Sequence, residues 1–135
     1  MTRYLLDTNI LSHLIRNPQG PIADKISTVG EEAICTSLIV AAELSYGVAK
    51  KGSIKLAEQV ESVLSVLEVL PLESPLDTHY ALARTRLESK GESIGGNDLL
   101  IAAQALTLGY TLVTDNEREF RRVEGLKVEN WLGPV

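Results

Sequence analysis

The sequence predicts an α/β fold with a central, mostly parallel sheet of four to five strands and helices on both faces. Short apolar runs, such as Tyr4-Leu5-Leu6 and Thr111-Leu-Val-Thr114, are typical of strands buried on both faces. Segments with helical spacing separate these runs, and such connections join parallel strands by right-handed crossovers. The 135 residues suit one compact domain spanning residues 1–135.

The first half of the chain is predicted to form two strands and four helices. Apolar residues at helical spacing follow the first strand, and Pro21 can begin a second helix that ends at Gly30. Ser37 can cap a third helix, and Gly52-Ser53 separates it from a fourth. These signals predict strands at residues 4–6 and 32–36 and helices at residues 8–17, 21–29, 38–50 and 54–64.

The second half is predicted to form three strands and three helices. A short β-branched run that ends at Pro71 is typical of a strand. Ser74 can cap a helix with Pro75 at its first position, and Asn97 can cap the next helix, which Gly109 ends. These signals predict strands at residues 66–70, 110–114 and 127–131 and helices at residues 76–90, 98–108 and 117–120.

Composition excludes several kinds of site. The single cysteine, Cys35, rules out an internal disulfide and a thiolate zinc site, and neither His13 nor His79 has metal-ligand spacing. Polar residues and a glycine interrupt the longest apolar run and the N-terminus does not resemble a signal peptide, so we expect a cytoplasmic protein. The net charge of −5 argues against binding nucleic acid through a uniformly basic surface, although acidic residues that hold a cation are not free charge.

Four acidic residues stand where a functional site is expected. Asp7 and Asp115 each follow a strand, Glu43 lies in an apolar run, and Asp98 begins a helix. Taken singly, Asp7 and Asp98 are explained equally well as acids at helix starts, and Glu43 as the wet edge of an amphipathic helix. Because parallel strands end at the same edge of a sheet, the four can converge, and their mutual repulsion would then require a cation.

The chemistry of these ligands predicts the ion and the reaction. Carboxylates without Cys or His select magnesium or manganese, and magnesium commonly engages phosphate. A cation that activates water for attack on phosphorus requires no histidine or lysine base. The sequence therefore predicts metal-assisted hydrolysis of a phosphoester.

The same residues resemble the PIN-domain ribonucleases, particularly the VapC-type toxins of toxin–antitoxin pairs. The resemblance implies a single PIN-like domain, a magnesium-dependent endoribonuclease in which manganese can substitute, and a homodimer. It also implies inhibition by a small VapB-like antitoxin whose tail enters the active-site groove, and transfer RNA is one candidate among the RNA substrates. The likeness runs from Met1 to Trp131 and rests on four segments in order: Asp7-Thr8-Asn9, Ala42-Glu43-Leu44 with Gly47, Asn97-Asp98 with the run to Ala103, and Thr114-Asp115-Asn116 with Phe120.

The resemblance also assigns roles to individual residues. Asp7 and Asp98 match the principal metal ligands of the family, and Glu43 matches its third acidic position. Thr8 is expected to place a hydroxyl near the metal or a phosphate, or to be a simple helix-start residue. All four residues are therefore candidates for the site.

The fourth acidic position departs from the family pattern. The pattern places its key residue at Asn116, whereas the carboxylate here is one residue earlier. We expect Asp115 to act through the metal or its water, with Thr114 and Asn116 orienting it. Glu119 is a further candidate for this position.

Two classes of protein stay open as alternatives. One is a non-catalytic binding module whose acids are helix caps, and the other is a receiver-like phospho-acceptor domain. A receiver needs an acceptor Asp after a central strand, where this chain has Val69-Leu70-Pro71, and a Lys at a strand end, which it lacks. A phosphatase with an aspartyl nucleophile would need a second acid at Asn9.

Overall fold

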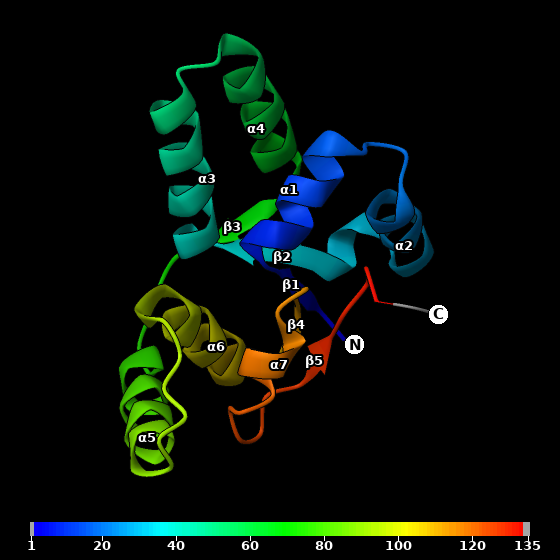
Figure 1. Ribbon diagram of the computed structural model, residues 1–135. Helices are drawn as coiled ribbons and strands as arrows, with labels where there is room; N and C mark the ends of the chain where they lie inside the picture. Colours follow the sequence, from blue (N-terminus) through cyan, green and yellow to red (C-terminus); the bar gives the residue numbers. More distant parts are fainter. Residues whose placement is uncertain (1, 134–135) are drawn as a thin grey trace.

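A five-stranded parallel sheet forms the centre of the protein, in a computed structural model that describes residues 2–133. The strand order is β3-β2-β1-β4-β5, so the first strand lies in the middle (Figure 1). The predicted α/β class and parallel sheet are confirmed, with five strands. The strands are β1 (Tyr4–Leu6), β2 (Ile34–Ser37), β3 (Glu68–Leu70), β4 (Thr111–Val113) and β5 (Val128–Glu129).

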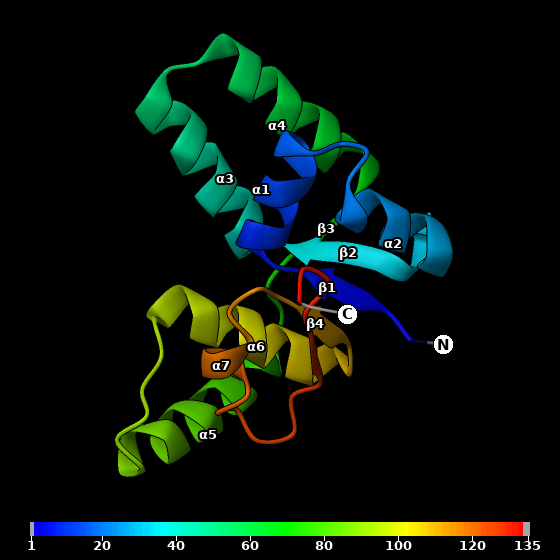
Figure 2. The same ribbon diagram turned by 45° about the vertical axis from the view of Figure 1, so that its right-hand side comes forward.

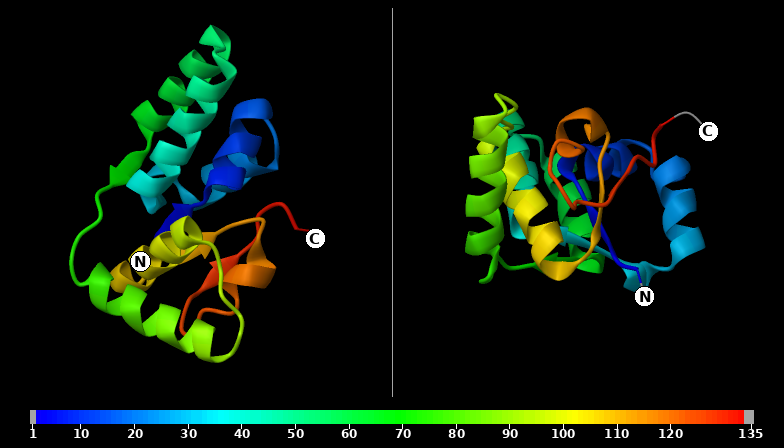
Figure 3. Two further views of the ribbon diagram at one scale, coloured as in Figure 1. Left: turned by 60° about the vertical axis from the view of Figure 1, so that its left-hand side comes forward. Right: turned by 90° about the horizontal axis from the view of Figure 1, so that it is seen from below.

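Helices cover both faces of this sheet in two layers (Figures 1 and 2). On one face lie α1 (Thr8–Arg16), α2 (Pro21–Val29), α3 (Leu38–Lys51) and α4 (Ile54–Val66). On the other face lie α5 (Leu76–Ser89), α6 (Gly96–Leu108) and α7 (Glu117–Phe120). The pair formed by α3 and α4 projects away from the sheet (Figure 3).

The position of β1 in the middle of the sheet explains why its residues are apolar. Leu5 and Leu6 point to opposite faces of the sheet, and both are fully buried because each face is covered by helices. Each such side chain stabilises the fold by about 1.5–3 kcal/mol through its burial.

No helix among residues 2–133 combines the length and apolar character needed to cross a membrane.

Several predicted boundaries were wrong by one or two residues and the predicted cap of α5 was also wrong, and local hydrogen bonds explain the cases at α5 and α6. Residues 31–33 form a 3₁₀ helix, η1 (Glu31–Ala33), so β2 begins only at Ile34. Helix α6 begins at Gly96, because the Gly95 carbonyl already accepts the Leu99 N–H at 2.9 Å, so Asn97 is not the cap. Helix α5 begins at the expected residue, but the Ser74 hydroxyl donates to an Asp77 oxygen at 2.8 Å instead of capping the helix, and Pro75 takes the cap position.

Two predicted helix ends are confirmed. The Ser37 hydroxyl accepts the Ile39 N–H at 3.0 Å and caps α3. Gly109 ends α6 in the left-handed conformation, with φ of 70°, which favours glycine over residues with a Cβ.

The register of the central strands places their ends together. Leu6 of β1 pairs with Val113 of β4, and the Asp7 N–H donates to the Val113 carbonyl at 2.9 Å. Asp7 and Thr114, the first residues beyond the two strands, therefore meet at the carboxyl edge of the sheet. Ligands bind at this edge in open parallel sheets.

Candidate active site

An open cleft of about 340 Å³ lies at this edge, where β1 and β4 end. It brings together three of the acids predicted from the sequence, which come from the strand–helix junction after β1, from α3 and from α6. The full lining is Asp7, Thr8, Asn9, Ser12, Arg16, Glu43, Asp98 and Asn116.

Asp7 is buried and fixed on both of its oxygens. Its Oδ1 accepts the Thr8 N–H at 2.8 Å, which caps α1, and its Oδ2 accepts the Thr114 hydroxyl at 2.7 Å. Burial raises the pKa of Asp7 and the charge of Glu43 raises it further, while the two hydrogen bonds lower it. Asp7 is thus both a helix cap and a lining residue of the cleft, so the two interpretations of its position are compatible.

Glu43 is held by a residue at the start of α1. The Thr8 hydroxyl donates to Oε1 of Glu43, which is half-buried on α3. This hydrogen bond ties α1 to α3 across the cleft. The side chain of Thr8 therefore does more than begin a helix, because it fixes the direction of the Glu43 carboxylate.

Asp98 lies in the first turn of α6 and is half-buried. Burial raises its pKa to about 6, and the negative charges of Asp7, Glu43 and Glu119 contribute to the rise. The like charges thus repel one another across the cleft. A cation bound among them would relieve this repulsion.

In the segment after β4, the neighbouring residues Asp115 and Asn116 have side chains that point in different directions, and only that of Asn116 lines the cleft. Asn116 lines the cleft, where its Nδ2 donates to a Glu119 oxygen at 3.0 Å and its N–H donates to the Thr114 hydroxyl at 3.0 Å. Asp115 is exposed and does not line the cleft. Its carboxylate accepts the Asn130 amide at 3.3 Å.

The donor set fits a hard divalent ion that keeps part of its water. Within residues 2–133, no three His, Cys, Asp or Glu side chains stand close enough to enclose a metal by themselves. Magnesium is commonly bound through one or two carboxylates with several waters, so an open carboxylate cleft suits it better than a closed cage would. Burial is the main reason why the pKa values of Asp7 and Asp98 are raised, and the neighbouring negative charges, which such an ion would offset, add to the rise.

Three lining residues, Asn9, Ser12 and Arg16, were not among the site residues predicted from the sequence. Ser12 and Arg16 lie on α1 four and eight residues after Thr8. Residues four apart are neighbours on a helix surface. With Thr8 as a site residue, this spacing therefore predicts that Ser12 and Arg16 lie on the same side of the helix as Thr8.

Comparison with known proteins identifies the relatives of this chain. Residues 4–126 match the PIN domain family. The chain is 40% identical to Ribonuclease VapC2 of Rickettsia felis over 95% of this chain and 97% of that protein. It is 32% identical to the tRNA(fMet)-specific endonuclease VapC of Shigella flexneri, over 97% and 99% of the two chains.

Solved structures show the same fold. The crystal structure of VapBC2 from Rickettsia felis bound to a DNA fragment from their promoter matches with a TM-score of 0.90 and 38% identity, over 96% of this chain and 99% of that one. The crystal structure of DNA-bound VapBC from Salmonella typhimurium matches with a TM-score of 0.87 and 34% identity, over 97% and 99%.

Proposed function

The chain belongs to the PIN-domain family, and on that premise we propose that it is a metal-dependent endoribonuclease and the toxin of a type II toxin–antitoxin pair. The observation that carries the proposal is the meeting of Asp7, Glu43 and Asp98 in one open cleft, with the pKa of Asp98 raised to about 6. A helix cap does not need two further carboxylates beside it. The cleft therefore favours the nuclease over a binding module whose acids are only caps.

Asp7, Glu43 and Asp98 are the residues that would hold the ion, directly or through its bound waters, and we propose that the ion is Mg²⁺, with Mn²⁺ as a substitute. When bound, the ion lowers the pKa of a water and offsets charge on the leaving oxygen of the phosphodiester. The protein positions these acids: Thr114 fixes Asp7, and Thr8 fixes Glu43. Their hydroxyl hydrogen bonds keep the two carboxylates aimed into the cleft.

For the fourth position, the contacts favour Asn116 with Glu119 over Asp115. Asn116 lines the cleft and holds Glu119, whose charge reaches Asp98, whereas the Asp115 carboxylate bonds to Asn130 outside it. We expect Glu119→Gln to lower kcat/KM for RNA cleavage about 10- to 100-fold, as loss of a supporting group does. Asp115→Asn, with the same change of charge, should stay within about twofold. A larger fall in kcat/KM for Asp115→Asn than for Glu119→Gln would instead assign the fourth position to Asp115.

The substrate and partners follow from the relatives. We propose transfer RNA as the first substrate to test, because one relative is named for that activity. The matched VapBC structures support a small VapB-like antitoxin as partner.

We propose that the protein is a homodimer, as the family resemblance implies. Exposed apolar residues on the hairpin of α3 and α4 could form the dimer interface, since Tyr46 is 66% exposed and Ile54 is 79% exposed. We also propose a cytoplasmic location, because transfer RNA, the proposed substrate, is found there.

The test is cleavage of a small-RNA pool by the purified protein without its antitoxin. Magnesium, manganese and chelator are compared, and each ion should also raise the melting temperature, because a ligand that binds only the folded state stabilises it. We expect defined fragments that need the metal. A folded protein with neither cleavage nor a metal-dependent rise in melting temperature would overturn the nuclease and favour the binding module.

A further inference from the structure

Arg16 is the only basic residue among the described residues that line the cleft. It lies in the last turn of α1, and its side chain is exposed. Three ion pairs occur among residues 2–133, and Arg16 takes part in none of them. A guanidinium at the edge of a carboxylate-lined cleft is therefore available to a ligand.

The spacing along α1 fixes where this guanidinium can act. Thr8, Ser12 and Arg16 are four residues apart, so they follow one side of the helix away from the carboxylates. With a rise of about 1.5 Å per residue, the backbones of Thr8 and Arg16 are on the order of 12 Å apart along the axis. A guanidinium two turns along α1 from Thr8 is therefore better placed for a neighbouring phosphate of a bound strand than for a phosphate at the carboxylates.

The charges of the cleft show why a neighbouring phosphate needs such a residue. A metal would offset the carboxylates near Asp7, but it does nothing for phosphates further along the strand. The protein carries a net charge of −5, so it does not attract a polyanion by its overall field. Arginine binds phosphate through two parallel hydrogen bonds and stays charged at all working pH values.

We propose that Arg16, with the Ser12 hydroxyl beside it, binds a backbone phosphate of the RNA strand next to the cleavage site. The assignment rests on the proposed function, since it deepens the substrate contacts of the same cleft. Arg16 is a substrate-binding residue and takes no part in bond cleavage. Its loss should therefore weaken RNA binding and raise KM while kcat is retained.

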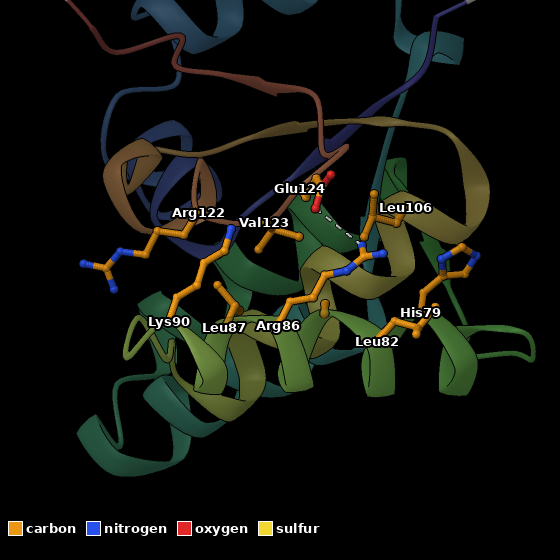
Figure 4. A pocket seen from close by; sticks show the side chains of 10 residues that line it. His79, Leu82, Arg86, Leu87, Lys90, Leu106, Arg122, Val123 and Glu124 are labelled. Atoms are coloured by element: carbon orange, nitrogen blue, oxygen red, sulfur yellow. Dashed lines mark ion pairs between the residues drawn. The ribbon is translucent and has the colours of Figure 1, made fainter.

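A second basic cleft provides the control. Arg86, Lys90 and Arg122 lie along α5 and the segment after α7, around a cavity of about 240 Å³ (Figure 4). Arg86 is paired there with Glu124 at 3.7 Å. This cleft belongs to the helix layer of α5–α7, and none of the three catalytic carboxylates lines it. Lys90 is exposed, so Lys90→Ala makes the same change in net charge as Arg16→Ala at a different place.

The experiment measures binding of a fluorescent single-stranded RNA in chelator, where no cleavage occurs, at several salt concentrations. Arg16→Ala should raise Kd about 5- to 10-fold at moderate salt, for RNAs of different sequence alike. The slope of log K against log salt should become shallower by about 0.7, the value for one phosphate contact on a single strand. Arg16→Lys should keep the slope, and Lys90→Ala should match the wild type in both Kd and slope.

Equal slopes for wild type and Arg16→Ala would overturn the proposal. So would an equal change in Lys90→Ala, because the effect would then reflect net charge alone. Cleavage kinetics with metal give the second readout, where a fall in kcat at unchanged KM would also contradict it. A wild-type protein that cuts no RNA with any metal would overturn the proposed function, while the slopes measured without metal would still decide the role of Arg16.

Discussion

Replacing Asp7 with asparagine is expected to lower the rate of RNA cleavage about a thousandfold, a loss of about 4 kcal/mol of transition-state stabilisation. The change removes one negative ligand at nearly constant volume. The Oδ1 atom of asparagine can still accept the Thr8 N–H and cap α1, so the helix start is kept. The Nδ2 group that takes the place of Oδ2 cannot accept the Thr114 hydroxyl, so it must donate to that hydroxyl, which turns to accept.

The Asp7→Asn experiment needs two readouts. The first is kcat/KM with magnesium. The second is the chemical denaturation midpoint, which should change little because the weaker, neutral hydrogen bond to Thr114 is offset by the loss of a buried charge. Asp24→Asn is the matched control, since Asp24 is exposed on α2 and does not line the cleft. Cleavage by Asp7→Asn within tenfold of wild type would remove Asp7 from the metal site.

Asp98→Asn should lose a similar amount of activity, and it should make the metal-free protein more stable at neutral pH. Burial and the charges of Asp7, Glu43 and Glu119 hold the pKa of Asp98 at about 6, above its ordinary value of 3.8. The ionised form is thus disfavoured in the folded state. This cost is fully present above pH 6, becomes smaller as the pH falls from 6 to 3.8, and is absent at lower pH, where Asp98 is protonated in both states.

The size of this stabilisation follows from the shift in pKa. A pKa of about 6 in place of 3.8 corresponds to at most about 3 kcal/mol. Asp98 is half-exposed, so solvent screening reduces this to about 1 kcal/mol. The expected gain is roughly 3 °C in melting temperature at pH 7 in chelator, with almost none at pH 4.

With bound metal, the wild type should have a higher melting temperature than Asp98→Asn, which is the reverse of the order in chelator. A divalent ion that binds only the folded wild type raises its melting temperature, and Asp98→Asn should respond weakly because a ligand is missing. The comparison uses thermal unfolding of both proteins from pH 4 to pH 8, with chelator and with magnesium. Equal melting temperatures at pH 7 in chelator would show that the like charges around Asp98 cost nothing.

Local patterns predicted the elements of this fold because their causes are local. The apolar run at β1 and the glycine at the end of α6 each determine the structure within a few residues, and both were placed correctly. The start of α6 was misplaced by two residues, since Gly95 and Asn97 are both plausible caps and only backbone hydrogen bonds choose between them.

Local sequence patterns could not predict which side chains after β4 face the cleft. Asp115 was expected in the site, yet its N–H donates to Asn9 and its carboxylate accepts from Asn130, which are 106 and 15 residues away in the sequence. Contacts of that range decide which side of a turn faces the cleft, and they become visible only in the folded chain. The approach of Asp7, Glu43 and Asp98 was predictable because the sheet topology fixes where strand ends and helix starts lie.

The hydrogen bond from the Thr114 hydroxyl to Asp7 has a consequence for synthesis of the protein. It joins residues 107 positions apart, and the backbone bond from Asp7 to Val113 spans nearly the same distance. Such long-range contacts form late in folding, because the intervening chain must first be brought together. A nascent chain on the ribosome is therefore expected to have no ordered carboxylate at Asp7, the proposed metal ligand, until nearly all of its residues have been made. The active cleft is completed only when the fourth strand joins the first.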